Sequence, residues 1–92
     1  MLKGKVAVIS GASKGIGRAT VLRLAQDGVD IAIGATSREL LESVSKEAES
    51  FGVQVLTGYC DVAEEVDCLT LVESALNQFG KVDILINNAG IG

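Results

Sequence analysis

The chain has 92 residues, enough for one small domain that buries only about 60–65% of its unfolded surface. Hydrophobic residues make up 48%, proline is absent and aromatic residues are scarce, which is typical of an aliphatic α/β domain. The net charge is −4 and the eight basic residues are scattered, so the sequence argues against nucleic-acid binding. Two cysteines without any histidine exclude an ordinary zinc site and every histidine-based catalytic triad.

No membrane partner is expected either. No apolar run approaches the roughly 20 residues of a membrane span, and no charged-then-apolar leader precedes the first strand. These features predict a soluble, cytoplasmic protein, in which Cys60 and Cys68 are expected to be reduced thiols.

The chain opens with an apolar strand predicted at residues 5–10. A glycine-rich turn follows and leads into a helix predicted over residues 15–27, which Gly28 ends. The next apolar run predicts a second strand at residues 30–34. The buried stripe expected on this first helix consists of Gly17, Val21, Leu24 and Gly28.

The second half of the chain repeats this pattern twice. Thr36 and Glu39 form a capping-box pair that predicts a helix ending at Gly52, with Leu41, Val44, Ala48 and Phe51 buried. A third strand is expected at residues 53–59 and a fourth at residues 82–86. Between them, Asp61 and Glu64 predict the start of a helix that Gly80 ends, with an apolar face of Val66, Leu69, Val72, Leu76 and Phe79.

Strands that alternate with helices imply a parallel sheet with right-handed crossovers. The βαβαβαβ order predicts a Rossmann-like, doubly wound α/β fold in truncated form, with strand order 3-2-1-4. The first two helices would cover one face of the sheet and the third the other. Ligands bind such folds at the carboxyl ends of the strands, beside the first strand, where the strand order reverses.

The glycine-rich turn lies at that place. Gly11, Gly15 and Gly17 let the backbone turn sharply and let a ligand approach the main chain. The N–H groups of the first helical turn and the helix dipole favour an anion there, and a diphosphate is the natural occupant. A P-loop is excluded because Lys14 precedes Gly15 rather than following the last glycine.

Three segments carry a family resemblance: residues 11–17 with the pattern Gly-x-x-x-Gly-x-Gly, residues 60–62 with Cys-Asp-Val, and residues 87–90 with Asn-Asn-Ala-Gly. In order and approximate spacing they resemble the short-chain dehydrogenase/reductase family from the first strand to the last residue. Ala-Thr-Ser at residues 35–37 adds a similarity to 3-oxoacyl-carrier-protein reductases and related carbonyl reductases. The resemblance implies that residues 1–92 are the cofactor-binding half of such a protein.

The resemblance also assigns roles to residues. The diphosphate and the adenosine ribose would be lined by Gly11, Ser13, Gly15, Ile16 and Gly17. The adenine amino group would be bound by Asp61, with the backbone of Val62 beside it; a plain helix cap is the alternative for Asp61. The adenosine ribose and the nicotinamide side of the cofactor would be near Asn87, Ala89 and Gly90. The alternative for Asn87 and Asn88 is that they form a turn after the strand, and both roles can hold together.

The residues after the second strand favour NADP over NAD. A ribose-binding acid is expected about 20 residues beyond the glycine turn, but residues 34–37 contain none. Lys14 and Arg38 offer positive charge to a 2′-phosphate, while Thr36 and Ser37 offer hydroxyl and backbone N–H groups. The alternative is that neither residue contacts the cofactor: Lys14 would be an exposed loop lysine and Arg38 a solvated residue in the first turn of the helix.

No catalytic residue can be assigned. The family's chemistry requires a tyrosine with a lysine four residues later, and a serine. The single tyrosine, Tyr59, is followed at that distance by Ala63 and is interpreted as a packing residue of the third strand. The sequence therefore predicts the NADP(H)-binding portion of a reductase that transfers hydride between NADPH and a ketone or 3-oxoacyl-type substrate, with its catalytic residues outside this chain. The alternatives are a stand-alone nucleotide-binding or self-assembling module without turnover, and an inert fragment.

The fourth strand, with Ile84, Leu85 and Ile86, would form an open apolar edge. Such an edge invites association. We therefore expect a homo-oligomer that forms through this strand or through the face beside the third helix.

Overall fold

A computed structural model describes residues 2–13 and 15–88. In these residues four strands alternate with three helices, and their bounds in chain order are β1 (Val6–Ser10), α1 (Gly15–Gln26), β2 (Asp30–Ala35), α2 (Arg38–Glu49), β3 (Val55–Tyr59), α3 (Glu65–Phe79) and β4 (Ile84–Asn87). Every predicted element is present, and the bounds differ from the predicted ones by a few residues, as helix and strand ends commonly do.

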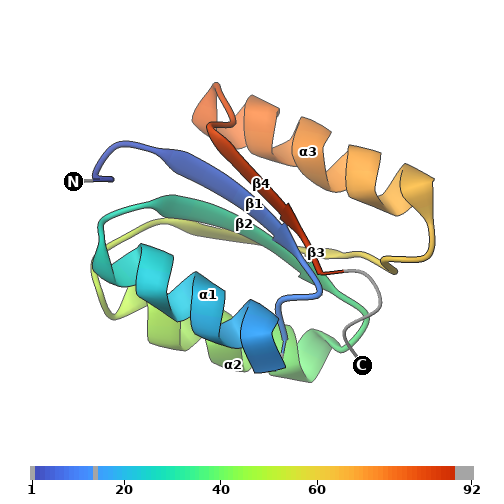
Figure 1. Ribbon diagram of the computed structural model, residues 1–92, viewed down its shortest axis with the longest axis horizontal. Coiled ribbons are helices and arrows are strands. Elements are labelled where there is room, and N and C mark those ends of the chain that lie inside the picture. The colour runs from blue at the N-terminus through green and yellow to red at the C-terminus, as the bar shows by residue number, and fades with distance from the viewer. Residues whose placement is uncertain (1, 14, 89–92) are drawn as a thin grey trace.

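The four strands form one parallel sheet in the order β3-β2-β1-β4, which confirms the predicted order. The register places Val8 of β1 between Ala32 of β2 and Leu85 of β4. Helices α1 and α2 lie on one face of the sheet and α3 lies on the other (Figure 1), as expected for right-handed crossovers. The fold is therefore the predicted Rossmann-like arrangement.

Each face of the sheet has its own apolar core, because β1 and most of β2 are buried on both sides. On the α1 and α2 side, Ile9, Ile31 and Ile33 pack with Val21 and Val44. The smaller core under α3 consists of Val8, Ala32, Cys60, Leu71 and Ala75. Continuous aliphatic runs of this kind are what a parallel sheet covered on both faces requires.

The predicted stripe of α3 is wrong in part. Val66, Leu69 and Leu76 are 69%, 56% and 45% exposed, whereas Leu71 and Ala75 are the buried residues of this helix. The face of α3 that packs on the sheet is therefore rotated from the predicted one. The other helices follow their predicted stripes more closely, except that Phe51, just beyond α2, is 45% exposed.

Both predicted helix caps are also corrected. The N-cap of α2 is Ser37, whose side chain accepts a hydrogen bond of 3.3 Å from the backbone N–H of Leu40, so Thr36 lies outside the helix. Helix α3 begins at Glu65, after a turn in which the backbone N–H of Glu64 donates to the carbonyl of Asp61. Asp61 therefore belongs to the loop before α3 and does not cap it.

Candidate functional site: a groove at the carboxyl ends of the strands

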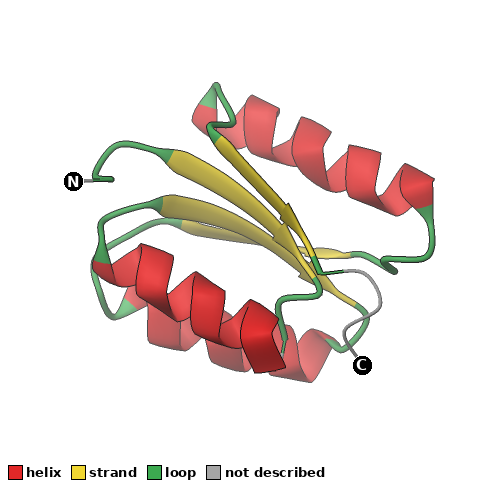
Figure 2. Ribbon diagram, in the orientation of Figure 1, coloured by secondary structure: helices red, strands yellow, loops and turns green. Residues whose placement is uncertain are grey.

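The loops that follow β1, β2 and β3 meet at one end of the sheet (Figure 2). They enclose a cavity of about 200 Å³, here called the loop cavity, which is lined by Gly11, Ser13, Ala35, Thr36, Cys60, Asp61 and Val62. Five of these residues were singled out in the sequence as cofactor-binding candidates: Gly11, Ser13, Thr36, Asp61 and Val62. The structure thus brings together residues that are up to 51 positions apart in the chain.

The first wall of the loop cavity is the turn from β1 into α1. Gly11 has a positive φ of 66°, and a Cβ on Gly17 would lie 2.0 Å from the carbonyl oxygen of Gly11. Only glycine at position 17 lets the helix start so close to the turn. The first turn of α1, which begins at Gly15, thus stands directly beside the turn. Backbone N–H groups at a helix start attract anions.

The second wall comes from the loop between β2 and α2. Thr36 is exposed at this loop, Ser37 caps α2, and Arg38 opens the helix with its side chain 92% exposed. The Nε atom of Arg38 lies 3.5 Å from a carboxylate oxygen of Glu42. An exposed pair of this type contributes little to stability, so the guanidinium group of Arg38 can change partners at small cost.

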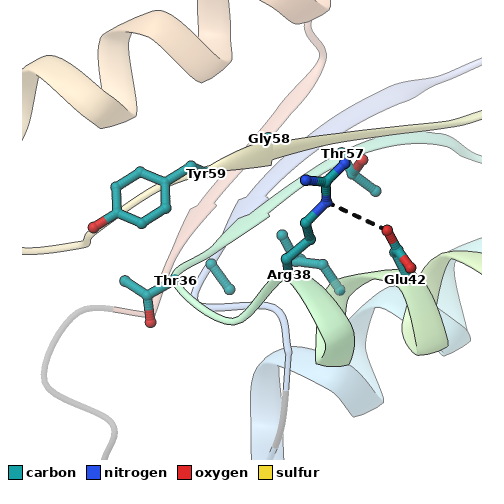
Figure 3. A pocket seen from close by; sticks show the side chains of 8 residues that line it. Thr36, Arg38, Glu42, Thr57, Gly58 and Tyr59 are labelled. Atoms are coloured by element: carbon teal, nitrogen blue, oxygen red, sulfur yellow. Dashed lines mark ion pairs between the residues drawn. The ribbon is translucent and has the colours of Figure 1, made fainter.

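A larger cavity of about 480 Å³ adjoins this wall, between the start of α2 and the end of β3. It shares Ala35 and Thr36 with the loop cavity and is further lined by Arg38, Glu42 and Tyr59. Figure 3 shows Arg38 and Glu42 entering it from α2 and Tyr59 from β3. Tyr59 is 66% exposed, so its interpretation as a strand packing residue is wrong: it lies on β3, which is an edge strand of the sheet in the described residues.

The third wall is the loop from Cys60 to Glu64, and local hydrogen bonds hold it in place. The backbone N–H of Ala63 donates to Oδ1 of Asp61 at 3.0 Å, while the backbone N–H of Asp61 donates to Oδ2 of Asp67 at 3.0 Å. The loop is thereby tied to the first turn of α3. One oxygen of the Asp61 carboxylate is used within its own loop.

The end of β4 is joined to the end of β1. The hydroxyl of Ser10 donates to Oδ1 of Asn87 at 2.8 Å, and Nδ2 of the buried Asn88 donates to the carbonyl of Ser10 at 2.9 Å. These bonds place the β4 end beside the glycine turn. Sequence reasoning treated Asn87 as a ligand and turn residue but missed that Asn88 fixes β4 to β1; its position directly after a strand was the available signal.

Three of the predicted site residues, Lys14, Ala89 and Gly90, lie outside the described residues. Ile16 is 61% exposed on the first turn of α1. Within residues 2–13 and 15–88, no cluster of three or more potential metal ligands occurs, and no helix has the length and apolar character needed to cross a membrane.

The short-chain dehydrogenase family model matches residues 5–92, which is nearly the whole chain and includes every wall of the loop cavity. The chain belongs to the short-chain dehydrogenase family. Members of this family are oxidoreductases that bind a nicotinamide dinucleotide. The resemblance stated from the three sequence segments is therefore confirmed.

Individual relatives agree with this assignment. The chain is 41% identical over 90 residues to the 3-oxoacyl-[acyl-carrier-protein] reductase FabG of Thermotoga maritima, covering 98% of this chain and 37% of that protein. NAD⁺-bound xylitol dehydrogenase matches with a TM-score of 0.89 and 42% identity, over 97% of this chain and 34% of that one. The alcohol dehydrogenase of the archaeon Thermococcus sibiricus, complexed with 5-hydroxy-NADP, matches with a TM-score of 0.82 and 40% identity, over 88% and 35% of the two chains. This chain thus spans about a third of the length of each of these three proteins.

Proposed function

We propose that the loop cavity binds the adenosine part of NADP(H), with the diphosphate at the start of α1. The observation that carries the proposal is the convergence of Gly11, Thr36 and Asp61 from three separate loops on one cavity. In this arrangement Asp61 accepts a hydrogen bond from the adenine amino group with its second carboxylate oxygen. The backbone of Val62 lies beside the base.

The diphosphate site is supported by the close contact between Gly17 and the turn at Gly11. A residue with a side chain at position 17 would separate the helix start from the loop. With glycine there, the first N–H groups of α1, from Gly15 and Ile16 onward, can donate to diphosphate oxygens. Ser13, which is buried in the cavity wall, adds a hydroxyl group to the same surface.

The preference for NADP over NAD rests on charge. No carboxylate occurs among residues 34–37 to bind a ribose 2′-hydroxyl or to repel a 2′-phosphate. Lys14 and Arg38 supply positive charge, and Thr36 and Ser37 supply donors. The weak, exposed pairing of Arg38 with Glu42 leaves the guanidinium group available to a phosphate near the larger cavity.

The nicotinamide side of the cofactor would extend from the glycine turn toward the end of β4. Asn87, Ala89 and Gly90 are proposed to line this side, and the hydrogen bond from Ser10 to Asn87 supports the placement of Asn87. Bound there, the nicotinamide supplies a hydride at its ring. The residues of this chain bind and orient the cofactor, and none of them is proposed as the acid or base of the reaction.

As the whole reaction we propose hydride transfer between NADPH and a ketone or 3-oxoacyl-type substrate, with the catalytic serine, tyrosine and lysine outside this chain. The likeness to a 3-oxoacyl-[acyl-carrier-protein] reductase supports this substrate class. Residues 1–92 are then one dinucleotide-binding half-domain. The alternative function is a nucleotide-binding or self-assembling module without turnover. A cytoplasmic location stays a prediction, which the two free thiols support.

We further propose that the chain forms a homo-oligomer through β4 or the adjoining face of α3. In the described part of the chain β4 pairs only with β1. Leu85 of β4 is 64% exposed, and Val66 and Leu69 of α3 are exposed as well. An apolar surface beside an open strand edge favours association.

Titrations with NADPH and NADH test the proposed cofactor. NADPH should bind the unmodified chain more tightly than NADH does. Lys14→Glu should weaken the binding of NADPH far more than that of NADH, because only NADPH carries the 2′-phosphate. Lys46→Glu, which makes the same charge change in the last turn of α2, should leave the ratio of the two affinities unchanged. Equal losses for both cofactors in Lys14→Glu would rule out Lys14 as the residue that discriminates between them.

A further inference from the structure

Cys60 and Cys68 lie side by side at the boundary between the loop cavity and α3. Their Sγ atoms are 3.7 Å apart, and neither is part of a disulfide. Cys60 follows β3 and is 1% exposed, while Cys68 lies in the first part of α3 and is partly buried. A disulfide requires a sulfur separation of about 2.05 Å, so the two atoms must approach by about 1.6 Å.

The pair connects two separate cavities. Cys60 lines the loop cavity together with Asp61 and Val62. Cys68 lines a small cavity of about 100 Å³ between α3 and β4, which is otherwise mostly apolar and includes Leu69 and Leu85. In the monomer without bound cofactor, a small oxidant can therefore reach Cys68 through this cavity, which Asn87 also lines.

We propose that Cys60 and Cys68 are a peroxide-sensitive thiol pair whose oxidation to a disulfide weakens dinucleotide binding in the loop cavity. The effect on binding rests on the proposed function; the disulfide itself does not. The oxidant is a hydroperoxide, of which hydrogen peroxide is small enough for the cavity beside Cys68. Oxidation of Cys68 in α3 would in this way change the position of the loop that carries Asp61.

The chemistry proceeds in two steps. The thiolate of Cys68 attacks one oxygen of hydrogen peroxide, the O–O bond breaks, and the departing hydroxide takes up a proton to become water, leaving a sulfenic acid. Cys60 loses its proton and attacks the sulfur of Cys68, the S–O bond breaks, and the second hydroxide also leaves as water. Two thiols are thus oxidised to one disulfide while one peroxide is reduced to two water molecules.

The environment of the thiols sets this order. Burial, together with the neighbouring Cys68, raises the pKa of the Cys60 thiol to about 12, so Cys60 is a poor first nucleophile at neutral pH. Cys68 is the more accessible thiol and reacts first. Closure of the disulfide then requires deprotonation of Cys60, so its rate should rise with pH.

The packing around Cys60 decides which side of the pair moves. A Cβ on Gly34 would lie only 2.6 Å from the Cβ of Cys60, which shows how closely Cys60 fits against β2. The movement therefore falls on the first turn of α3. That turn carries Asp67, whose carboxylate accepts the hydrogen bond from the backbone N–H of Asp61. Pulling Cys68 toward Cys60 displaces this contact and, with it, Asp61.

The chemical part is tested by treating the chain with hydrogen peroxide at several pH values and alkylating the remaining thiols. Peptide mass spectrometry should then find a Cys60–Cys68 crosslink that forms faster as the pH rises. Cys68→Ser, which removes one sulfur at a partly exposed position, should form no crosslink. A crosslink that forms in urea but not in the folded chain would overturn the proposal.

The coupling to the loop has two readouts. Oxidised chain should bind NADPH about fivefold or more weakly than reduced chain, the lower range of typical coupling between sites, whereas Cys68→Ser should bind equally before and after peroxide. In ¹⁵N–¹H NMR spectra without cofactor, oxidation should shift the amide signals of Asp61 and Ala63. If neither reduced nor oxidised chain binds NADPH, the proposed function fails, and unshifted amides in the crosslinked chain still overturn the coupling.

Discussion

A Cβ atom at position 17 would lie 2.0 Å from the carbonyl oxygen of Gly11. This is far inside van der Waals contact, and the carbonyl belongs to backbone that cannot rotate away. The glycine pair therefore sets how closely α1 approaches the turn after β1. Any function that depends on the N–H groups of α1 depends on this contact.

Gly17→Ala should therefore damage both stability and binding. The added methyl group forces α1 and the turn apart. This should lower the free energy of unfolding by about 3 kcal/mol, the upper end for overpacking, and should weaken NADPH binding at least tenfold. Urea unfolding and NADPH titration measure the two effects. Ala19→Ser, at an exposed position of the same helix, is the control: it should leave NADPH binding unchanged and cost at most about 0.5 kcal/mol in stability. Wild-type stability and NADPH affinity in Gly17→Ala would contradict the described contact.

The roles of Thr36 and Ser37, which both carry a hydroxyl group just before α2, can be distinguished by substitution. Ser37 accepts the hydrogen bond from Leu40 and caps the helix, so Ser37→Ala should lower the free energy of unfolding by about 1 kcal/mol. Thr36→Ala should leave it nearly unchanged. The measurement is urea unfolding without cofactor, and the reverse ranking would restore Thr36 as the cap.

The sequence could not choose between these two residues. Both are good caps, and the spacing from Thr36 to Glu39 matches a capping box. The choice depends on where the backbone leaves β2, which extends to Ala35 and so places the first helical residue at Arg38. The start of α2 therefore depends on the position at which β2 ends in the folded sheet.

Asp83 connects the start of β4 to β1 and predicts a pH dependence of stability. Its Oδ2 accepts a hydrogen bond of 2.9 Å from the backbone N–H of Val6 and lies 3.2 Å from Nζ of Lys81. The hydrogen bond from Val6, with the charge of Lys81, lowers the pKa of the Asp83 carboxyl below its usual 3.8. The folded chain therefore holds this proton less tightly than the unfolded chain does.

The stabilisation is present above pH 3.8 and is lost as the pH falls through the lowered pKa of the folded state. Melting temperatures of the unmodified chain and Asp83→Asn should differ at pH 6 and converge toward pH 2. Asp27→Asn, which removes an exposed pair with Arg23, should give a small difference throughout. A gap for Asp83→Asn that stays constant with pH would contradict the account.

Leu85 tests the proposed self-association. The unmodified chain should form dimers or larger assemblies at micromolar concentration, and Leu85→Lys should shift it toward the monomer mass of 9.5 kDa because a charge would be buried in the contact. Leu40→Lys changes an exposed leucine of α2 and should leave the assembly intact. Light scattering measures both, and a clean monomer of the unmodified chain would refute the interface.

The prediction of α3 shows where sequence periodicity stops being informative. Its apolar residues cover a broad arc, and a helical spacing can be drawn through Val66, Leu69 and Leu76 as well as through Leu71 and Ala75. Periodicity identifies an apolar stripe but not the surface that it contacts. By contrast, the strand order followed from the alternation of strands and helices, because crossover handedness leaves few arrangements.

The candidate site was predictable for a related reason. In a parallel sheet the loops after the strands meet at one end, so Gly11, Thr36 and Asp61 could be brought together from their positions alone. The residues that hold these loops in place could not be predicted. The contact of Asp67 with the backbone of Asp61 and that of Asn88 with Ser10 depend on loop geometry that has no sequence pattern.

The most direct test of the account is an NADPH titration of the ¹⁵N-labelled chain followed by ¹⁵N–¹H NMR. We expect saturable shifts concentrated on the first turn of α1 and on the loop-cavity amides, those of Gly11, Ser13, Thr36, Asp61 and Val62. Little change is expected at the opposite end of the sheet, around Gly28 and Gly52. Shifts absent from the loop cavity, or centred at that opposite end, would contradict the account.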